Sequence, residues 1–237
     1  MTTTTDLRFQ ANGASAALEL KVSPRARVMR LKVDPRTGAV TLTVPRRASQ
    51  KKALEWAAGH RAWIEAQLAK VPAPERLGPG ASLPLYGRPH KIDWTPAHSR
   101  IPSAQGDSIQ VGGPEAGLEA RLLRWLRRHA ADLLAAETQE FAAKAGVTVT
   151  RVGVGDPMSR WGSCSSSGAI RYSWRLILAP EYVRRATVAH EVAHRVHMDH
   201  SANFHALVDS LLENGDARRA RDWLRRNGAS LHRIARV

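Results

Sequence analysis

The sequence contains little cysteine and no long hydrophobic run, and acidic residues are scarce beside basic ones. The single cysteine, Cys164, excludes a disulfide framework within the chain. No stretch approaches the roughly eighteen apolar residues that a membrane span needs. The segment from Met1 to Asp6 is a threonine run without the charged and apolar regions of a signal peptide. We therefore expect a cytoplasmic protein with no membrane partner.

The shortage of acidic residues leaves a strongly basic chain, with 36 Lys and Arg against 21 Asp and Glu and a net charge of +15. Such a charge attracts polyanions, so non-specific nucleic acid is a candidate partner. The alternative is that the arginines reflect genome composition and form a solvated face. Arginines are densest at the C-terminus, at Arg218, Arg219, Arg221, Arg225, Arg226, Arg233 and Arg236. Apolar residues between them predict a basic amphipathic helix.

The hydrophobic pattern predicts an α+β protein. Residues 16–44 alternate as strands do, with a turn at 35–38, and residues 48–70 have helical spacing. A linker at 72–80 and short strands follow. We divide the chain into an N-terminal β-rich lobe with one helix, residues 15–112, and a core at 113–237, which together form one integrated unit. The hydrophobic content of 43% supports a real core.

The second half of the chain shows an ordered series of elements. One long helix is predicted between Gly112 and Gly146, followed by a strand at 147–154 and a hairpin at 160–165 and 169–174. The run Ala179-Pro180-Glu181 then begins another helix, because proline is favoured in the first turn and an acidic residue near the positive helix end. The predicted order is therefore a long helix, a small sheet and a second helix.

That second helix carries the most informative motif, His190-Glu191-Val192-Ala193-His194, followed by His200. Residues four apart lie one above the other on a helix, so His190 and His194 can bind one metal ion. A catalytic zinc site needs three protein ligands, an open position for water, and a base for that water's proton. We expect His190, His194 and His200 to bind Zn²⁺ and Glu191 to be the catalytic base. The alternative is an ordinary helix with structural histidines.

The third ligand has rivals. Zincins with this spacing commonly have glycine where His197 stands, and glycine makes the left-handed turn that ends the metal helix. Histidine adopts that conformation at a cost. His197 and His205 are therefore rivals of His200. A more distant carboxylate is the remaining rival, either Asp209 or Glu213.

The chain resembles the YgjP-like metallopeptidases, which are related in motif to the SprT-like and WLM zincins. The resemblance rests on the segments 160–165 (Arg-Trp-Gly-Ser-Cys-Ser) and 174–180 (Trp-Arg-Leu-Ile-Leu-Ala-Pro), and on the histidine motif with His200-Ser201 and Phe204. It extends more weakly to Arg25-Ala26-Arg27, Val44-Pro45, Trp63-Ile64 and Leu85-Tyr86-Gly87. It implies a zincin-like core in which His190, His194 and His200 bind zinc. In this core Glu191 is the general base of a zinc-dependent metallopeptidase.

The chemistry suggests how a peptide substrate is handled. Glu191 accepts a proton from the zinc-bound water and passes it to the leaving amine. An extended substrate can pair with a sheet edge, for which residues 169–172 are the candidate. Trp161 and Gly162 either belong to the site or are structural, and we favour the structural interpretation, with Trp161 as a core residue and Gly162 as a turn residue. We interpret Cys164 as a small buried side chain.

The same sequence features are compatible with a second class of function. The protein is alternatively a nucleic-acid-binding protein with a structural zinc, whose extra ligands would be His197 and His205. The two hypotheses also combine, as a basic peptidase that acts on proteins near DNA. In a structural site, however, the glutamate between the two histidines has no role.

Overall fold

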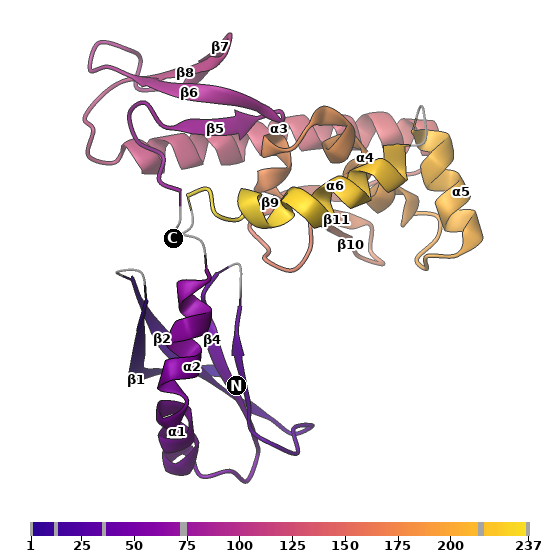
Figure 1. The fold of residues 1–237 in the computed structure, drawn as a ribbon. Helices are drawn as coiled ribbons and strands as arrows, with labels where there is room; N and C mark the ends of the chain where they lie inside the picture. Colours follow the sequence, from indigo (N-terminus) through magenta and orange to yellow (C-terminus); the bar gives the residue numbers. More distant parts are fainter. Residues whose placement is uncertain (1, 12–13, 35–36, 72–74, 213–215, 236–237) are drawn as a thin grey trace. The chain divides into compact units, whose positions relative to one another are not determined.

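The computed structural model describes residues 2–11, 14–34, 37–71, 75–212 and 216–235. The chain forms two compact units that divide between Pro74 and Glu75. Both units mix helices and strands, which confirms the α+β class with a β-rich N-terminal part (Figure 1). No helix among the described residues is long and apolar enough to cross a membrane.

The N-terminal unit is a four-stranded sheet with two helices packed on it. Its elements are β1 (Thr2–Ala11), β2 (Ala14–Ser23), β3 (Arg30–Val33), β4 (Val40–Pro45), α1 (Gln50–Gly59) and α2 (Arg61–Ala69). The strand order is β1-β2-β4-β3, with β2 and β4 parallel. Alternate residues of the strands, such as Leu18 and Leu42, are fully buried with Ile64 of α2. The turn expected at 35–38 lies partly outside the described residues.

The helix expected at 48–70 is interrupted, so the unit has two helices where the sequence predicts one. His60 has φ −97° and ψ 16°, which is not a helical conformation. Its ring Nδ1 lies 2.8 Å from the carbonyl oxygen of Trp56, and it follows Gly59, a residue that weakens helices. Helical periodicity continues across this break, so the hydrophobic pattern alone does not reveal it.

The C-terminal unit is built along one long helix, α3 (Leu118–Ala145), which ends at Gly146 in a left-handed conformation. The first of its two sheets has the order β5-β6-β8-β7. These strands are β5 (Ser82–Leu85), β6 (Arg88–Trp94), β7 (Ser103–Gln105) and β8 (Ser108–Val111). Leu85, Ile92 and Ile109 from this sheet share one hydrophobic core with Leu122 and Leu126 of α3. This shared core explains why the compact units divide at 74 and 75, whereas the sequence pattern suggests 112 and 113.

The second sheet consists of β9 (Arg151–Gly155), β10 (Gly162–Cys164) and β11 (Ala169–Ser173) in the order β10-β11-β9. The expected hairpin is confirmed, because β10 and β11 are antiparallel. The expectation that residues 169–172 form a sheet edge is wrong. Strand β11 is central, since β9 pairs with its other side in parallel. The edge strands are β9 and β10, and parallel pairing between β9 and β11 is a non-local feature that the local pattern does not encode.

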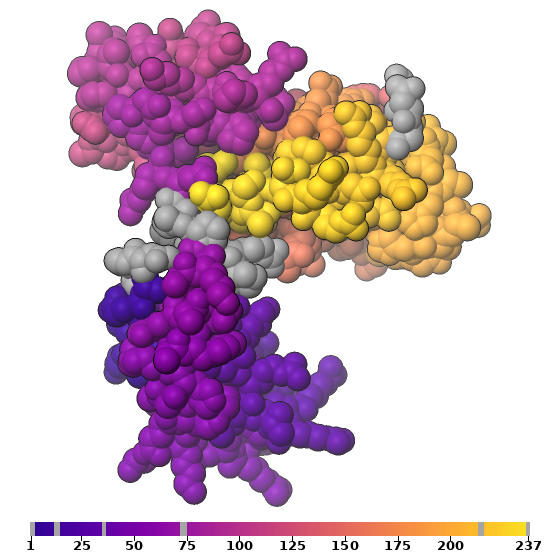
Figure 2. All heavy atoms as spheres, in the orientation of Figure 1, coloured from indigo at the N-terminus to yellow at the C-terminus, as the bar shows by residue number. Residues whose placement is uncertain are grey.

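The remaining helices follow the second sheet. They are the 3₁₀ helix η1 (Trp174–Leu178), α4 (Glu181–Ala193), α5 (Ala202–Leu211) and α6 (Asp216–Leu231). Helix α4 begins directly after Pro180, as predicted. Helices α4, α5 and α6 pack together, and their atoms form a continuous surface in Figure 2. The buried Arg175 binds Asp156 and the carbonyl oxygens of Leu231 and Ile234, which fixes the end of α6.

Candidate metal centre and active site

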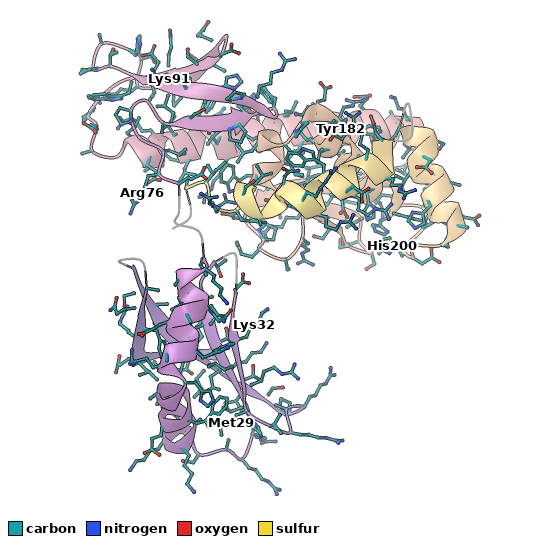
Figure 3. All side chains as sticks on the ribbon, in the orientation of Figure 1. Met29, Lys32, Arg76, Lys91, Tyr182 and His200 are labelled. Carbon is teal, nitrogen blue, oxygen red and sulfur yellow. The ribbon has the colours of Figure 1, made fainter. Side chains whose placement is uncertain are left out.

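Helix α4 and the turn after it bring the three expected histidines together. The ring centroids of His190 and His194, one turn apart on α4, are 4.9 Å from each other. After the helix ends, the chain folds back and places His200 next to them, with its Nε2 3.3 Å from Nε2 of His190. One ligand nitrogen from each of the three side chains lies within 4.8 Å of the others. In Figure 3, His200 lies at the periphery of the C-terminal unit.

The turn between α4 and α5 needs no left-handed residue. Among the described residues, the only non-glycine residues with positive φ are Tyr86 and Ala235. The expected conformational cost at His197 is therefore absent. Instead, the backbone carbonyl of His197 accepts a hydrogen bond of 3.0 Å from Nδ1 of His194. Because a carbonyl oxygen only accepts, Nδ1 of His194 carries the proton and its Nε2 is free to bind a metal.

The rival ligands lie outside this histidine group. His205 has its ring centroid 6.4 Å from that of His200, and its side chain is exposed on the pocket wall. Asp209 also lines the pocket, without joining the group within 4.8 Å. Glu213 lies outside the described residues. Among the residues that the structure describes, His190, His194 and His200 are thus the set that can bind one ion.

Phe204 supports all three imidazoles. Its ring centroid is 4.9 Å from that of His190, 4.6 Å from that of His194 and 4.8 Å from that of His200. Phe204 is fully buried in the first turn of α5, where Ser201 caps the helix by accepting from the Phe204 backbone N–H. The sequence motif includes Phe204, but only the fold shows that it orients the histidines.

The surroundings favour the neutral form of the His190 imidazole, which is the form that binds a metal. Burial, together with charge repulsion from the neighbouring His194 and His200, lowers the pKa of His190 to about 4. A closely spaced group of imidazole nitrogens is suited to bind a cation. The residues present therefore fit a bound metal ion, with one nitrogen from each histidine.

Glu191 lies beside the histidines with only 5% of its surface exposed. Burial raises the pKa of its carboxyl group to about 7, while the positive charge of Arg160 acts in the opposite direction. A carboxylate whose proton affinity is raised in this way is suited to accept and return protons near neutral pH. The pocket that contains Glu191 has a volume of about 720 Å³ and is lined by His190, Arg160 and residues of α5 and α6.

Gly162 allows strand β10 to lie against Glu191. A Cβ atom at Gly162 would be 2.5 Å from Oε1 and 2.7 Å from Cδ of Glu191. Gly162 is the first residue of β10, so its interpretation as a turn residue is wrong. The sequence offers no signal for this role beyond the glycine itself, because the contact joins residues 29 positions apart. The arrangement leaves the edge of β10 directly beside the candidate base.

The residues around Gly162 in the segment 160–164 have separate roles. Trp161 packs against the hydrophobic core, with its ring 4.8 Å from that of His232, and it also lines the pocket. Cys164 is only half-buried, in contrast to the expected buried side chain. Burial nevertheless raises the pKa of its thiol, which favours the unreactive protonated form. Arg160 is exposed and lines the pocket near Glu191.

Gly162→Ala is expected to lower peptide hydrolysis by about 10²-fold, because the new methyl group displaces the Glu191 carboxylate by a large fraction of an ångström or more. Zinc content should be unchanged, since no ligand is touched. Gly78→Ala is the matched control, because a Cβ atom there meets nothing within 4 Å. The measurement is the hydrolysis rate of each zinc-loaded variant. Equal rates for the two would show that the close contact is unimportant.

A helix that presents two histidines and a glutamate, with a third histidine from the following turn, is the arrangement that defines a zincin-type metallopeptidase site. The comparison of families agrees with this class. Residues 27–227 match the model described as YgjP-like, metallopeptidase domain, and the chain belongs to this family. The match includes most of both units, from just before β3 into α6. No curated protein and no solved structure matches the chain.

Proposed function

We propose that this protein is a zinc-dependent peptidase that hydrolyses peptide bonds, with Glu191 as its general base. The observation that carries the proposal is the grouping of His190, His194 and His200 next to a buried carboxylate, that of Glu191, which lines one pocket with His190. Three ligands leave a position for water and substrate, as catalytic zinc sites require. Membership of a metallopeptidase family supports the same reaction class.

The histidines would hold zinc through Nε2 of His194 and through one nitrogen each of His190 and His200. Bound zinc supplies Lewis acidity, which polarises a carbonyl group and makes water a better nucleophile near neutral pH. The hydrogen bond from His194 to the carbonyl of His197 and the packing of Phe204 hold the rings in place before any ion arrives. This preorganisation lowers the cost of binding the metal.

Glu191 would move the protons. One of its carboxylate oxygens accepts the proton of the attacking water, and the same group then donates it to the nitrogen of the leaving amine. Burial makes this exchange favourable, because the raised pKa brings the carboxyl group near the operating pH. Gly162 keeps the carboxylate in position by leaving room for it.

The free edge of β10 would bind the substrate backbone. Trp161 O and Ser165 N bond to β11, at Ser173 N and Ala169 O respectively. In an antiparallel ladder, alternate residues point the other way, so the N–H and C=O groups of Gly162 and Cys164 face the free edge. An extended peptide that pairs there would lie beside Glu191. This edge replaces residues 169–172 as the proposed substrate strand.

A structural zinc site in a nucleic-acid-binding protein is the less favoured alternative. Such a site closes its fourth position with cysteine or histidine. Among the described residues, neither His197 nor His205 nor Cys164 belongs to the group that can bind one ion. A buried glutamate beside the ligands also has no use in a closed site, whereas hydrolysis requires one.

Removing the metal tests the proposal. The zinc-loaded protein is expected to cleave unfolded casein, and a chelator should reduce the rate by at least about 10²-fold. Added zinc should restore most of the rate, whereas magnesium should not, because imidazole ligands favour zinc. The measurement is the release of soluble peptides. Cleavage that continues after complete metal removal, or an inactive zinc-loaded protein, would contradict the proposal.

A further inference from the structure

The catalytic pocket and the sheet beside it are lined by arginines without carboxylate partners. Arg160, Arg218 and Arg221 line the pocket that contains Glu191. All three side chains are exposed, and none of them forms an ion pair among the residues that the structure describes. Apart from Glu191, the lining contributes one carboxylate, that of Asp209. The pocket is therefore positively charged.

A second basic hollow lies on the outer face of the small sheet. Arg171 of β11 pairs with Gly153 of β9 and with Ser163 of β10, and Ala169 pairs with Arg151. Because side chains alternate along strands, Arg151 and Arg171 share one face. With Arg160 they line a hollow of about 590 Å³ that contains no acidic residue. Arg160 belongs to both hollows, and β10 contributes residues to each.

Two other arginines of α6, Arg219 and Arg225, have carboxylate partners. Arg219 lies 3.6 Å from Asp216 and stacks over the ring of Tyr182, at 4.1 Å from its centroid. Arg225 lies 3.1 Å from Asp222. These pairs are on the same helix as Arg218 and Arg221 but do not line the pocket. Arg219 and Arg225 are thus paired arginines outside the pocket, whereas Arg218 and Arg221 line it without an ion pair among the described residues.

We propose that the substrate is an acidic segment of polypeptide, with aspartate or glutamate side chains on both sides of the cleaved bond. This inference rests on the proposed peptidase function. A strand paired with the free edge of β10 directs alternate side chains to the two faces of the sheet. Those on the outer face extend into the hollow that Arg151, Arg160 and Arg171 line, and the part of the chain that enters the pocket lies near Arg218 and Arg221. Guanidinium groups bind carboxylates strongly, often through two hydrogen bonds.

A polypeptide fits these positions better than nucleic acid. The free arginines line two hollows joined by Arg160, on either side of a strand edge that offers backbone donors and acceptors. A duplex would instead bind a broad outward surface, where Arg219 and Arg225 would contribute as much as their neighbours. Both of these side chains are already paired with aspartates.

Two matched peptides test the inference, one with glutamates and one with glutamines flanking the same bond. The zinc-loaded protein is expected to cleave the glutamate peptide with at least about tenfold higher kcat/KM. The ratio of kcat/KM for the glutamate peptide to kcat/KM for the glutamine peptide should fall by roughly threefold or more in R218Q/R221Q and in R151Q/R171Q. The fall should come mainly from a higher KM for the glutamate peptide. R219Q/R225Q, on the same helix as Arg218 and Arg221, should leave the ratio unchanged. A ratio near one in the unaltered protein would overturn the inference.

A measurement of peptide binding without cleavage distinguishes failure of the acidic-substrate inference from failure of the proposed peptidase function. Zinc-loaded Glu191→Gln, labelled peptides and fluorescence anisotropy give affinities without cleavage. Preferential binding of the glutamate peptide, lost in R218Q/R221Q, supports the acidic ligand even if the unaltered protein cleaves neither peptide. Equal binding of the two peptides contradicts it. Tighter binding of a single-stranded oligonucleotide, weakened equally by R218Q/R221Q and R219Q/R225Q, also contradicts it and assigns the charge to nucleic acid.

Discussion

His190→Ala and His194→Ala are each expected to leave purified protein with less than about a tenth of the zinc that the unaltered chain carries, which should be one ion per chain. Each substitution removes a ligand from a group of three, and the remaining two imidazoles cannot enclose the ion. His194 has the greater effect on order, because its Nδ1 also anchors the turn at the His197 carbonyl. Inductively coupled plasma mass spectrometry of dialysed protein measures the content.

His200 is the third expected ligand, and His197 and His205 provide the controls. His200→Ala should lose most of the zinc, whereas His197→Ala and His205→Ala should keep it, because the first contributes only its backbone carbonyl and the second lies outside the group. Circular dichroism checks that the variants are folded. A full complement of zinc in both His190→Ala and His194→Ala would refute the site. A greater loss in His197→Ala or His205→Ala than in His200→Ala would transfer the third ligand to that residue.

Glu191→Gln is expected to reduce casein hydrolysis by 10²-fold or more while leaving zinc content and fold intact. Glutamine has nearly the same shape as glutamate and preserves the contact with Gly162, but its amide cannot accept a proton from water. The change also removes a carboxyl group that is costly to ionise in a buried position, so stability should not fall. Initial rates at saturating substrate measure the effect on kcat.

Glu140→Gln is the matched control for this substitution. Glu140 is a glutamate of α3 that pairs with Arg185 and Lys144, and it does not line the catalytic pocket. Its loss should leave the hydrolysis rate unchanged. Unaltered activity in Glu191→Gln would exclude Glu191 as the base. Loss of zinc from the same variant would instead make Glu191 a metal ligand.

The sequence predicts the local part of the site well. His190 and His194 share a helix face because of their spacing, and the start of α4 at Pro180 follows from helix-capping preferences. The spacing of His200 makes it a candidate, but His197 lies nearer to His194 in the sequence and His205 follows His200 by only five residues. Only the path of the turn, which directs the His197 carbonyl toward His194, separates them.

The contacts between residues that are far apart in the sequence could not be predicted. The contact between Gly162 and Glu191 depends on a strand that lies beside a helix, and no local pattern encodes such a contact. The same holds for the central position of β11, which follows from its parallel pairing with β9. The division of the chain is a further example, because Leu85 and Ile92 share a core with a helix that begins at Leu118. Composition indicates the positive charge but not which arginines lack partners.

X-ray absorption spectroscopy at the zinc edge tests the central claim most directly, because it counts the ligands of the bound ion. We expect three imidazole nitrogens and one further oxygen, all at about 2.0–2.1 Å from zinc, as in an open catalytic site. His200→Ala should remove one imidazole from this shell in any zinc that remains bound. A fourth imidazole, or a sulfur at about 2.3 Å, would show a closed structural site and contradict the account.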